Sequence, residues 1–152
     1  MKLEFSDLIR SGGLIKEEEI GLDQVRRFLK RARKDLLTAK KVIGSDGAVA
    51  LDLVYKAMFH SANALIRYFG LRPGRIGQHK AIIRATERIL GKPAEIYILR
   101  FDKLRQKRNY FEYGAGFVSS KTEIENGLVE AEKLINLIEN FLEEKNSQKK
   151  LL

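Results

Sequence analysis

The chain has 152 residues, no cysteine, two histidines and a formal net charge of +9. This length corresponds to one domain, which can bury a sizeable core without a disulfide or a metal. The absence of cysteine excludes a thiol nucleophile, an iron–sulfur cluster and a thiolate zinc site. Two histidines leave little room for an imidazole metal site, so we expect neither a metal nor another cofactor.

The N-terminus, residues 1–10, carries charges throughout and lacks the apolar core of a secretion signal. No uncharged apolar stretch reaches the length needed to span a membrane. The lack of cysteine also suits a reducing compartment. We therefore expect a soluble cytoplasmic protein with no membrane contact.

The positive charge is unevenly distributed along the chain. Residues 21–45 hold eight Lys or Arg and two acids, and residues 71–110 hold eleven and three. The first twenty and the last thirty-two residues each carry a net charge of −2. Such asymmetry favours an anionic partner for one face, either nucleic acid or an acidic protein. The alternative is a solvated surface that keeps the protein soluble.

The first half of the chain predicts a lead-in and two helices. Residues 1–21 form the lead-in, which Gly12-Gly13 interrupts. From residue 22 to Gly44, apolar residues recur at steps of three and four, as on one stripe of a helix. The next helix, about 48–69, is apolar around most of its circumference. We expect it in the centre of a bundle or in a subunit interface.

The second half predicts three more helices. They span 78–90, about 94–113 with Pro93 in the first turn, and a last helix to about residue 145. Ser120 and Glu123 have the spacing of a capping box at the start of the last helix.

We found no alternating strand pattern and no repeat. The fold class predicted is therefore all-α, an antiparallel up-and-down bundle of about five helices. The bundle would occupy residues 22–145, with a frayed tail at 146–152.

The fourth helix carries the strongest candidate site, because cations, an amide and tyrosines follow one another near its end. Cations hold phosphates, tyrosines stack on bases, and asparagine bonds to sugar or phosphate. The residues concerned are Arg105, Lys107, Arg108, Asn109, Tyr110 and Tyr113. The alternative is that Arg108 pairs with Glu112 four residues later while the tyrosines pack against a neighbouring helix.

Two segments resemble prokaryotic HEPN domains. Residues 55–65, Tyr-Lys-Ala-Met-Phe-His-Ser-Ala-Asn-Ala-Leu, resemble the second helix of these domains, and Arg108-Asn109 resembles their signature site. The resemblance covers roughly residues 20–145. It implies a homodimer, and many such domains are RNA-cleaving toxins that require no metal. Their signature is Arg, often a polar residue, and His after four to six intervening positions. Two copies form one composite site, and many small members work beside a nucleotidyltransferase antitoxin, the MNT partner.

Carried over residue by residue, the resemblance assigns the catalytic positions to Arg108, Asn109 and Tyr113. Tyr113 stands where the family has histidine. An unperturbed tyrosine has a pKa of about 10 and is a poor base at neutral pH, unlike an imidazole. The resemblance therefore predicts a toxin-type HEPN/MNT component that acts on or binds RNA through a basic cleft, with RNase activity weakened by Tyr113. The alternative is a non-catalytic dimeric module that docks a nucleotidyltransferase or binds a nucleotide.

The sequence does not decide whether the two histidines belong to the candidate site. His60 is either a satisfied histidine at a helix contact or, with Asn63, part of the cleft that holds Arg108. In the second case both would join Arg105, Lys107 and Tyr110 in binding RNA. His79, near the start of the third helix, is expected at the surface rather than in catalysis. It could extend a phosphate-binding edge with Arg72, Arg75 and Lys80.

Overall fold

The computed structural model describes residues 4–112 and 119–151, and for residues 109–112 it describes the backbone alone. The elements of the described part follow one another in this order: α1 (Ser6–Arg10), β1 (Leu14–Lys16), α2 (Leu22–Val42), α3 (Gly47–Tyr68), β2 (Leu71–Pro73), α4 (Gln78–Leu90), the 3₁₀ turn η1 (Lys92–Ala94), α5 (Glu95–Glu112) and α6 (Lys121–Lys150). The prediction of an all-α fold is confirmed. None of the described helices is long and apolar enough to cross a membrane.

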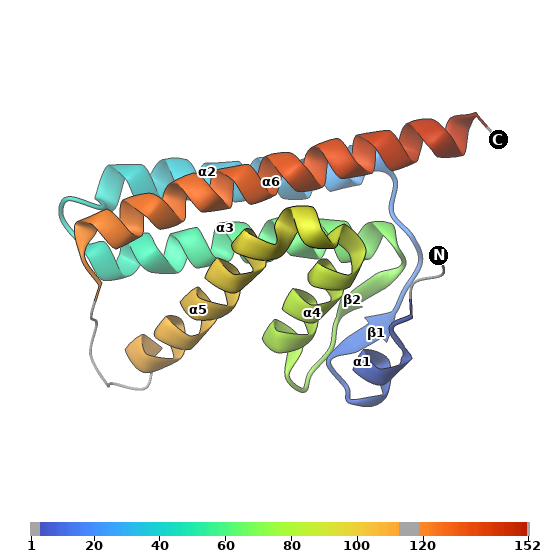
Figure 1. The fold of residues 1–152 in the computed structure, drawn as a ribbon, viewed down its shortest axis with the longest axis horizontal. Coiled ribbons are helices and arrows are strands. Elements are labelled where there is room, and N and C mark those ends of the chain that lie inside the picture. Colours follow the sequence, from blue (N-terminus) through green and yellow to red (C-terminus); the bar gives the residue numbers. More distant parts are fainter. Residues whose placement is uncertain (1–3, 113–118, 152) are drawn as a thin grey trace.

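Three long helices, α2, α3 and α6, lie side by side, and α4 and α5 cover another side of α3 (Figure 1). Helix α2 runs opposite to α3, but α6 runs in the same direction as α3 (Figure 1). The segment from β2 through α5 carries the chain back along α3 before α6 begins. The arrangement is therefore a bundle with a crossover rather than a simple up-and-down succession.

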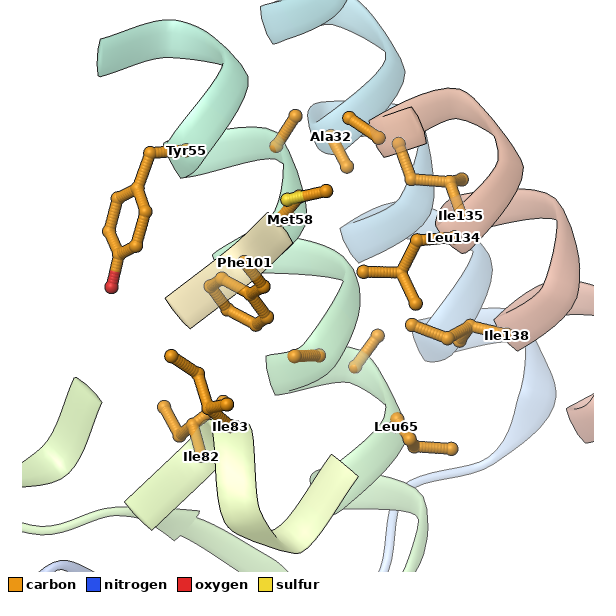
Figure 2. Packing of buried hydrophobic residues seen from close by; sticks show 14 of the residues in the cluster. Ala32, Tyr55, Met58, Leu65, Ile82, Ile83, Phe101, Leu134, Ile135 and Ile138 are labelled. Atoms are coloured by element: carbon orange, nitrogen blue, oxygen red, sulfur yellow. The ribbon is translucent and has the colours of Figure 1, made fainter. Parts of the chain in front are cut away.

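Helix α3 is the centre of the core, as its apolar circumference predicted. It packs against α2, α4, α5 and α6. In Figure 2, Met58 and Leu65 of α3 lie among Phe101 of α5 and Leu134 and Ile138 of α6, and all five side chains are buried. Because α3 has neighbours on most sides, residues on its different faces are directed to different helices. This position makes α3 the scaffold of the site described below.

The predicted helix ends are reproduced in part. Helix α4 spans the predicted residues, and the Ser120 hydroxyl caps α6 by accepting a bond from the Glu123 backbone N–H at 3.1 Å. The Glu123 carboxylate contacts Lys107, a bond that the capping pattern did not predict. Helix α6 also continues to Lys150, beyond the predicted frayed end at residue 145. Its last turn lies near the N-terminal segment, where Lys149 Nζ is 3.6 Å from Glu19 Oε2.

The N-terminal segment, predicted as a lead-in, is packed into the fold. Strand β1 pairs antiparallel with β2, with Leu14 opposite Pro73, and Leu8 and Leu14 are buried. The sequence predicted no strand here, because three-residue strands are too short to show alternation. The Gly74 N–H donates to the Gly13 carbonyl at 2.8 Å, and a Cβ on Gly74 would lie 2.0 Å from the Gly12 carbonyl oxygen. This tight contact fixes the loop from which α4 starts.

Candidate functional site

Arg108, near the end of α5, reaches across to α3. Its Nε donates to Asp52 Oδ1 at 3.1 Å, and its Cζ lies 5.4 Å from the centroid of the Tyr55 ring. Asp52 Oδ2 also contacts Lys56 Nζ at 2.8 Å. The carboxylate fixes the guanidinium from one side while the tyrosine ring supports its face, an arrangement that favours a cation. The Glu112 side chain, predicted as an alternative partner, is outside the described residues.

Tyr55 connects this arginine to His79 at the start of α4. Tyr55 Oη lies 2.6 Å from His79 Nδ1, and the two ring centroids are 5.7 Å apart. Phe59, one turn along α3, packs on the imidazole with its ring centroid at 4.9 Å. Figure 2 shows the Tyr55 ring directed away from the side of α3 that faces α2 and α6. We call Asp52, Tyr55, His79 and Arg108 the Arg108 cluster.

The Tyr55 hydroxyl stays neutral in this setting. Burial raises its pKa well above the usual range of tyrosine, although the nearby Arg108 and Arg105 act in the opposite direction. A neutral hydroxyl can donate one hydrogen bond and accept others. It can therefore stay bonded to His79 Nδ1 whether or not that nitrogen carries a proton.

Charged side chains of α3 and α5 surround the cluster. Arg105 Nε contacts Asp102 Oδ1 at 2.9 Å, and Gln106 donates to the other oxygen of Asp102 at 3.1 Å. Lys56 is about half exposed and Arg105 is one-fifth exposed. Among the side chains that the structure describes here, the cations Lys56, Arg105 and Arg108 outnumber the carboxylates of Asp52 and Asp102, and this balance suits a phosphate-bearing ligand.

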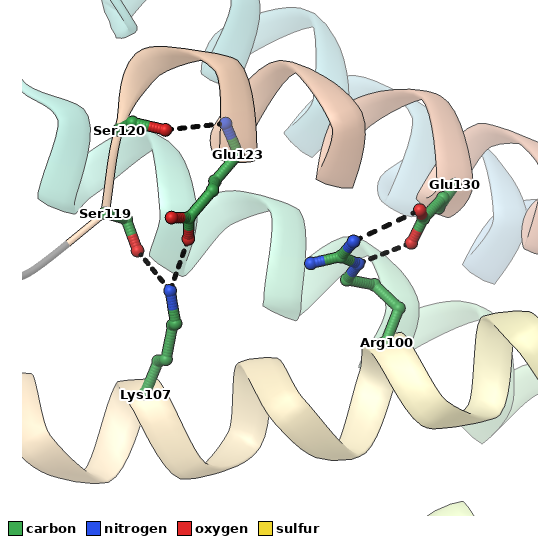
Figure 3. A network of polar contacts seen from close by, with 6 residues as sticks. All are labelled: Arg100, Lys107, Ser119, Ser120, Glu123 and Glu130. Carbon is green, nitrogen blue, oxygen red and sulfur yellow. Dashed lines mark hydrogen bonds and ion pairs between the residues drawn. The ribbon is translucent and has the colours of Figure 1, made fainter.

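Lys107, the residue before Arg108, is directed to another neighbour. Its Nζ bonds Ser119 Oγ at 2.8 Å and the Glu123 carboxylate at the start of α6 (Figure 3). Two turns earlier on α5, Arg100 pairs with Glu130 of α6 (Figure 3). The hydrogen bond from Lys107 holds the pKa of Glu123 below its usual value. These contacts tie α5 to α6 and do not involve the Arg108 cluster.

His60 and Asn63 lie on α3 but have partners outside the cluster. His60 Nδ1 is 2.8 Å from Asp35 Oδ2 of α2, and Arg31 contacts the other oxygen of this buried carboxylate at 2.9 Å. Asn63 Oδ1 accepts from Arg67 Nε at 3.1 Å. The structure thus places His60 at a contact between helices, the first of the two alternatives, and does not bring it together with Arg108.

His79, expected at the surface, is half-buried and bonded to Tyr55. No local signal could have found this pair, because it depends on how α4 packs against α3. Asp52 was likewise missed, since a single acid on an apolar helix has no distinctive spacing. Asn109 and Tyr110 are in α5 with side chains outside the described part, and Tyr113 is outside it altogether.

Within the described ranges, no three or more histidine and acidic side chains are grouped so as to hold a metal ion. The groups that the Arg108 cluster itself offers are an arginine, a neutral tyrosine, an imidazole and the charges around them. Guanidinium groups bind phosphate oxygens through several N–H donors. An imidazole exchanges protons near neutral pH.

The fold and this cluster define a small all-helical protein with a cationic site between its central helix and two neighbouring helices. The sequence profile of the HEPN domain matches residues 25–146, which is most of the chain. The chain belongs to the HEPN domain family. No curated protein sequence matches it.

Proposed function

We propose that this HEPN protein is directed at RNA and binds it through the Arg108 cluster, as the toxin-type component of a HEPN/MNT pair. The observation that carries the proposal is the position of Arg108. The arginine that corresponds to the family signature lies against Tyr55 and Asp52, in a region where Lys56 and Arg105 add positive charge. Two such clusters facing each other in a homodimer would form one continuous basic surface for a single-stranded RNA.

Binding is the first step to test, because Tyr113 replaces the histidine on which cleavage in the family depends. A mixed-sequence single-stranded RNA should bind the wild type at low salt, with an affinity that falls steeply as salt rises. Arg108→Ala should weaken binding about tenfold or more, because it removes a phosphate contact and the cation closest to Tyr55.

Arg100→Ala is the matched control for this measurement. Arg100 is on the same helix, is about as exposed as Arg108, and is also paired with a carboxylate, but it faces α6. It should bind RNA nearly as the wild type does. Equal affinities for Arg108→Ala and Arg100→Ala, or no RNA binding by the wild type at low salt, would contradict the proposal.

Toxicity is tested separately, by expression in a bacterial host. Wild-type protein should arrest growth, and Arg108→Ala should relieve the arrest at equal protein level. Tyr113→His restores the family spacing and should increase RNA cleavage if the site is a weakened nuclease. Unchanged growth with the wild type would contradict the toxin role while leaving RNA binding intact.

The second candidate is a non-catalytic dimeric module that docks a nucleotidyltransferase or binds a nucleotide. It is favoured by exposed apolar side chains on the faces of α5 and α6, where Ile96, Leu99 and Val129 are each at least half exposed. Exposed apolar groups beside charged residues are typical of protein contacts. Leu99→Arg should prevent co-purification with a co-expressed nucleotidyltransferase and leave RNA binding unchanged. If the nucleotidyltransferase still co-purifies with Leu99→Arg, this face is not its docking surface.

A further inference from the structure

We propose that His79, which lies outside the family signature, supplies the proton-transferring imidazole of the RNA site. This inference rests on the proposed RNA-directed function. The family pattern has its histidine on the same helix as the arginine, and this chain has Tyr113 there. The fold brings a different histidine, from the start of α4, to the tyrosine that Arg108 also contacts.

Tyr55 contacts both groups. The Arg108 Cζ and the His79 ring lie 5.4 Å and 5.7 Å from the centroid of the same tyrosine ring. The guanidinium and the imidazole therefore cannot be farther apart than these two distances combined. A guanidinium that holds a phosphate and an imidazole that moves a proton can together supply metal-free RNA cleavage.

Two described contacts fix the ring of His79. Nδ1 is bonded to Tyr55 Oη at 2.6 Å, and Phe59 packs on the ring. This bond orients the second nitrogen, Nε2, in the way that a hydrogen-bonded partner orients a catalytic histidine. Because the partner is a neutral hydroxyl, the bond persists in both protonation states of the imidazole.

The reaction would proceed as follows. Nε2 of neutral His79 accepts the proton of a ribose 2′-hydroxyl, while Nδ1–H donates to Tyr55 Oη. The 2′-oxygen bonds to the adjacent phosphorus, the bond from phosphorus to the 5′-oxygen breaks, and the departing oxygen takes a proton from water. The hydroxide that remains takes the proton from His79, which returns to its neutral form. Arg108 stabilises the negative charge that gathers on the phosphoryl oxygens. The products are a 2′,3′-cyclic phosphate and a free 5′-hydroxyl.

The charged and titratable groups described around the Tyr55–His79 pair lie on three helices. They are Asp52, Tyr55 and Lys56 on α3, Lys80 on α4, and Asp102, Arg105 and Arg108 on α5. A general base works in its unprotonated form. The cleavage rate should therefore rise with pH as the imidazole loses its proton, which gives the pH–rate profile a rising limb in the usual range of a histidine.

The decisive variant is His79→Asn. The amide can keep a hydrogen bond to Tyr55 Oη but cannot exchange a proton near neutral pH. Cleavage of a mixed-sequence single-stranded RNA should fall about a hundredfold, and the rising limb should disappear. Affinity for the same RNA with 2′-O-methyl groups, which cannot be cleaved by this route, should stay within about twofold because Arg108 is untouched.

His60→Asn is the matched control, since it changes the other histidine at a site directed to α2. Once both variants are confirmed to be folded by circular dichroism, His60→Asn should keep the rate and the pH profile of the wild type. Tyr55→Phe adds a second variant that leaves both histidines in place. It should lower the rate less than His79→Asn, because the imidazole remains but loses its orienting bond.

The outcomes separate this inference from the function on which it rests. Loss of cleavage and of the pH limb in His79→Asn, with 2′-O-methyl RNA binding retained, supports it. Cleavage by His79→Asn at the wild-type rate and pH profile overturns it. A wild type that binds RNA and cuts none also overturns it, while leaving the binding function standing. A wild type that binds no RNA ends both proposals.

Discussion

The two histidines are both held through Nδ1, but by partners of different chemistry. His60 faces the buried Asp35 carboxylate, which also contacts Arg31, whereas His79 faces the Tyr55 hydroxyl. An ionised carboxylate only accepts hydrogen bonds, and a hydroxyl both donates and accepts. The partner of His60 thus favours one arrangement that joins α2 to α3. The partner of His79 tolerates a change of protonation, so one histidine is built for structure and the other is suited to chemistry.

The largest effect is expected from the loop that precedes α4, the helix to which His79 belongs. In Gly74→Ala the new Cβ would collide with the backbone of Gly12, 2.0 Å away. The loop must move, which we expect to lower the free energy of unfolding by about 3 kcal/mol. That corresponds to a fall in melting temperature of roughly 6–12 °C for a chain of this size. Gly44→Ala is the control, because a Cβ there meets nothing within 4 Å. Equal melting curves for the two variants would show that the loop is not held in this way.

The second effect concerns the histidine assigned to structure. His60→Ala leaves Asp35, which is 1% exposed, with Arg31 alone. Losing one partner of a buried carboxylate should lower the free energy of unfolding by about 2 kcal/mol, measured by urea unfolding. RNA affinity should not change.

His79→Ala should show the opposite balance, with a stability loss of about 1 kcal/mol for the bond to Tyr55 and a large loss of cleavage. If His60→Ala impaired cleavage as much as His79→Ala, the assignment of a structural role to His60 and a chemical role to His79 would be wrong.

The sequence predicted the elements of the fold better than the contacts between them. The range of α4, the cap at Ser120 and the central position of α3 follow from periodicity and local turn chemistry, which neighbouring residues determine. The pairing of β1 with β2 joins segments more than fifty residues apart through three residues each. Nothing local distinguishes such short strands from a loop.

In the candidate site, too, the sequence predicted a residue but not the residues that it contacts. Arg108 was singled out because a basic run and a family pattern coincide in neighbouring residues. Its described partners, Asp52 and Tyr55, come from α3, and His79 comes from α4, so their meeting is a consequence of tertiary packing. A tyrosine on an apolar stripe reads as core, and Tyr55 is indeed buried, yet its hydroxyl still bonds a titratable group. The sequence therefore identified Arg108 but not the residues that pack around it.

A smaller effect should follow from changing the partner of His79 instead of the histidine. Tyr55→Phe keeps the ring that supports Arg108 and removes the bond to Nδ1, which should cost about 1 kcal/mol at neutral pH. Burial raises the pKa of Tyr55. Above about pH 10, the native protein therefore retains a hydroxyl proton that the unfolded chain releases.

The stabilisation from keeping this hydroxyl neutral is therefore complete below about pH 10 and is lost as the pH rises further. Between neutral and strongly alkaline pH, the wild type should lose more stability than Tyr55→Phe, as measured by urea unfolding. Parallel losses in the two proteins would mean that Tyr55 ionises as freely when folded as when unfolded.

The smallest effect is expected at the α5–α6 contact, which holds the helix end that carries Arg108. The Lys107 ammonium holds the pKa of Glu123 below its usual value, so the pair adds stability above the pKa of the unfolded carboxyl. That contribution is lost as the pH falls through the pKa of the folded one. Glu123→Gln should thus lower the melting temperature slightly at neutral pH, and the difference from the wild type should vanish in acid.

High salt should shrink the same difference, because the pair is partly exposed. Glu125→Gln is the control, since the Glu125 carboxylate lies 4.0 Å from Lys121 Nζ in an exposed pair within α6. If Glu123→Gln also weakens RNA binding slightly while Glu125→Gln does not, the α5–α6 contact helps to position Arg108 from the far side of its helix. If neither variant affects RNA binding, Asp52 and Tyr55 suffice to hold the arginine, and the contact with α6 serves stability alone.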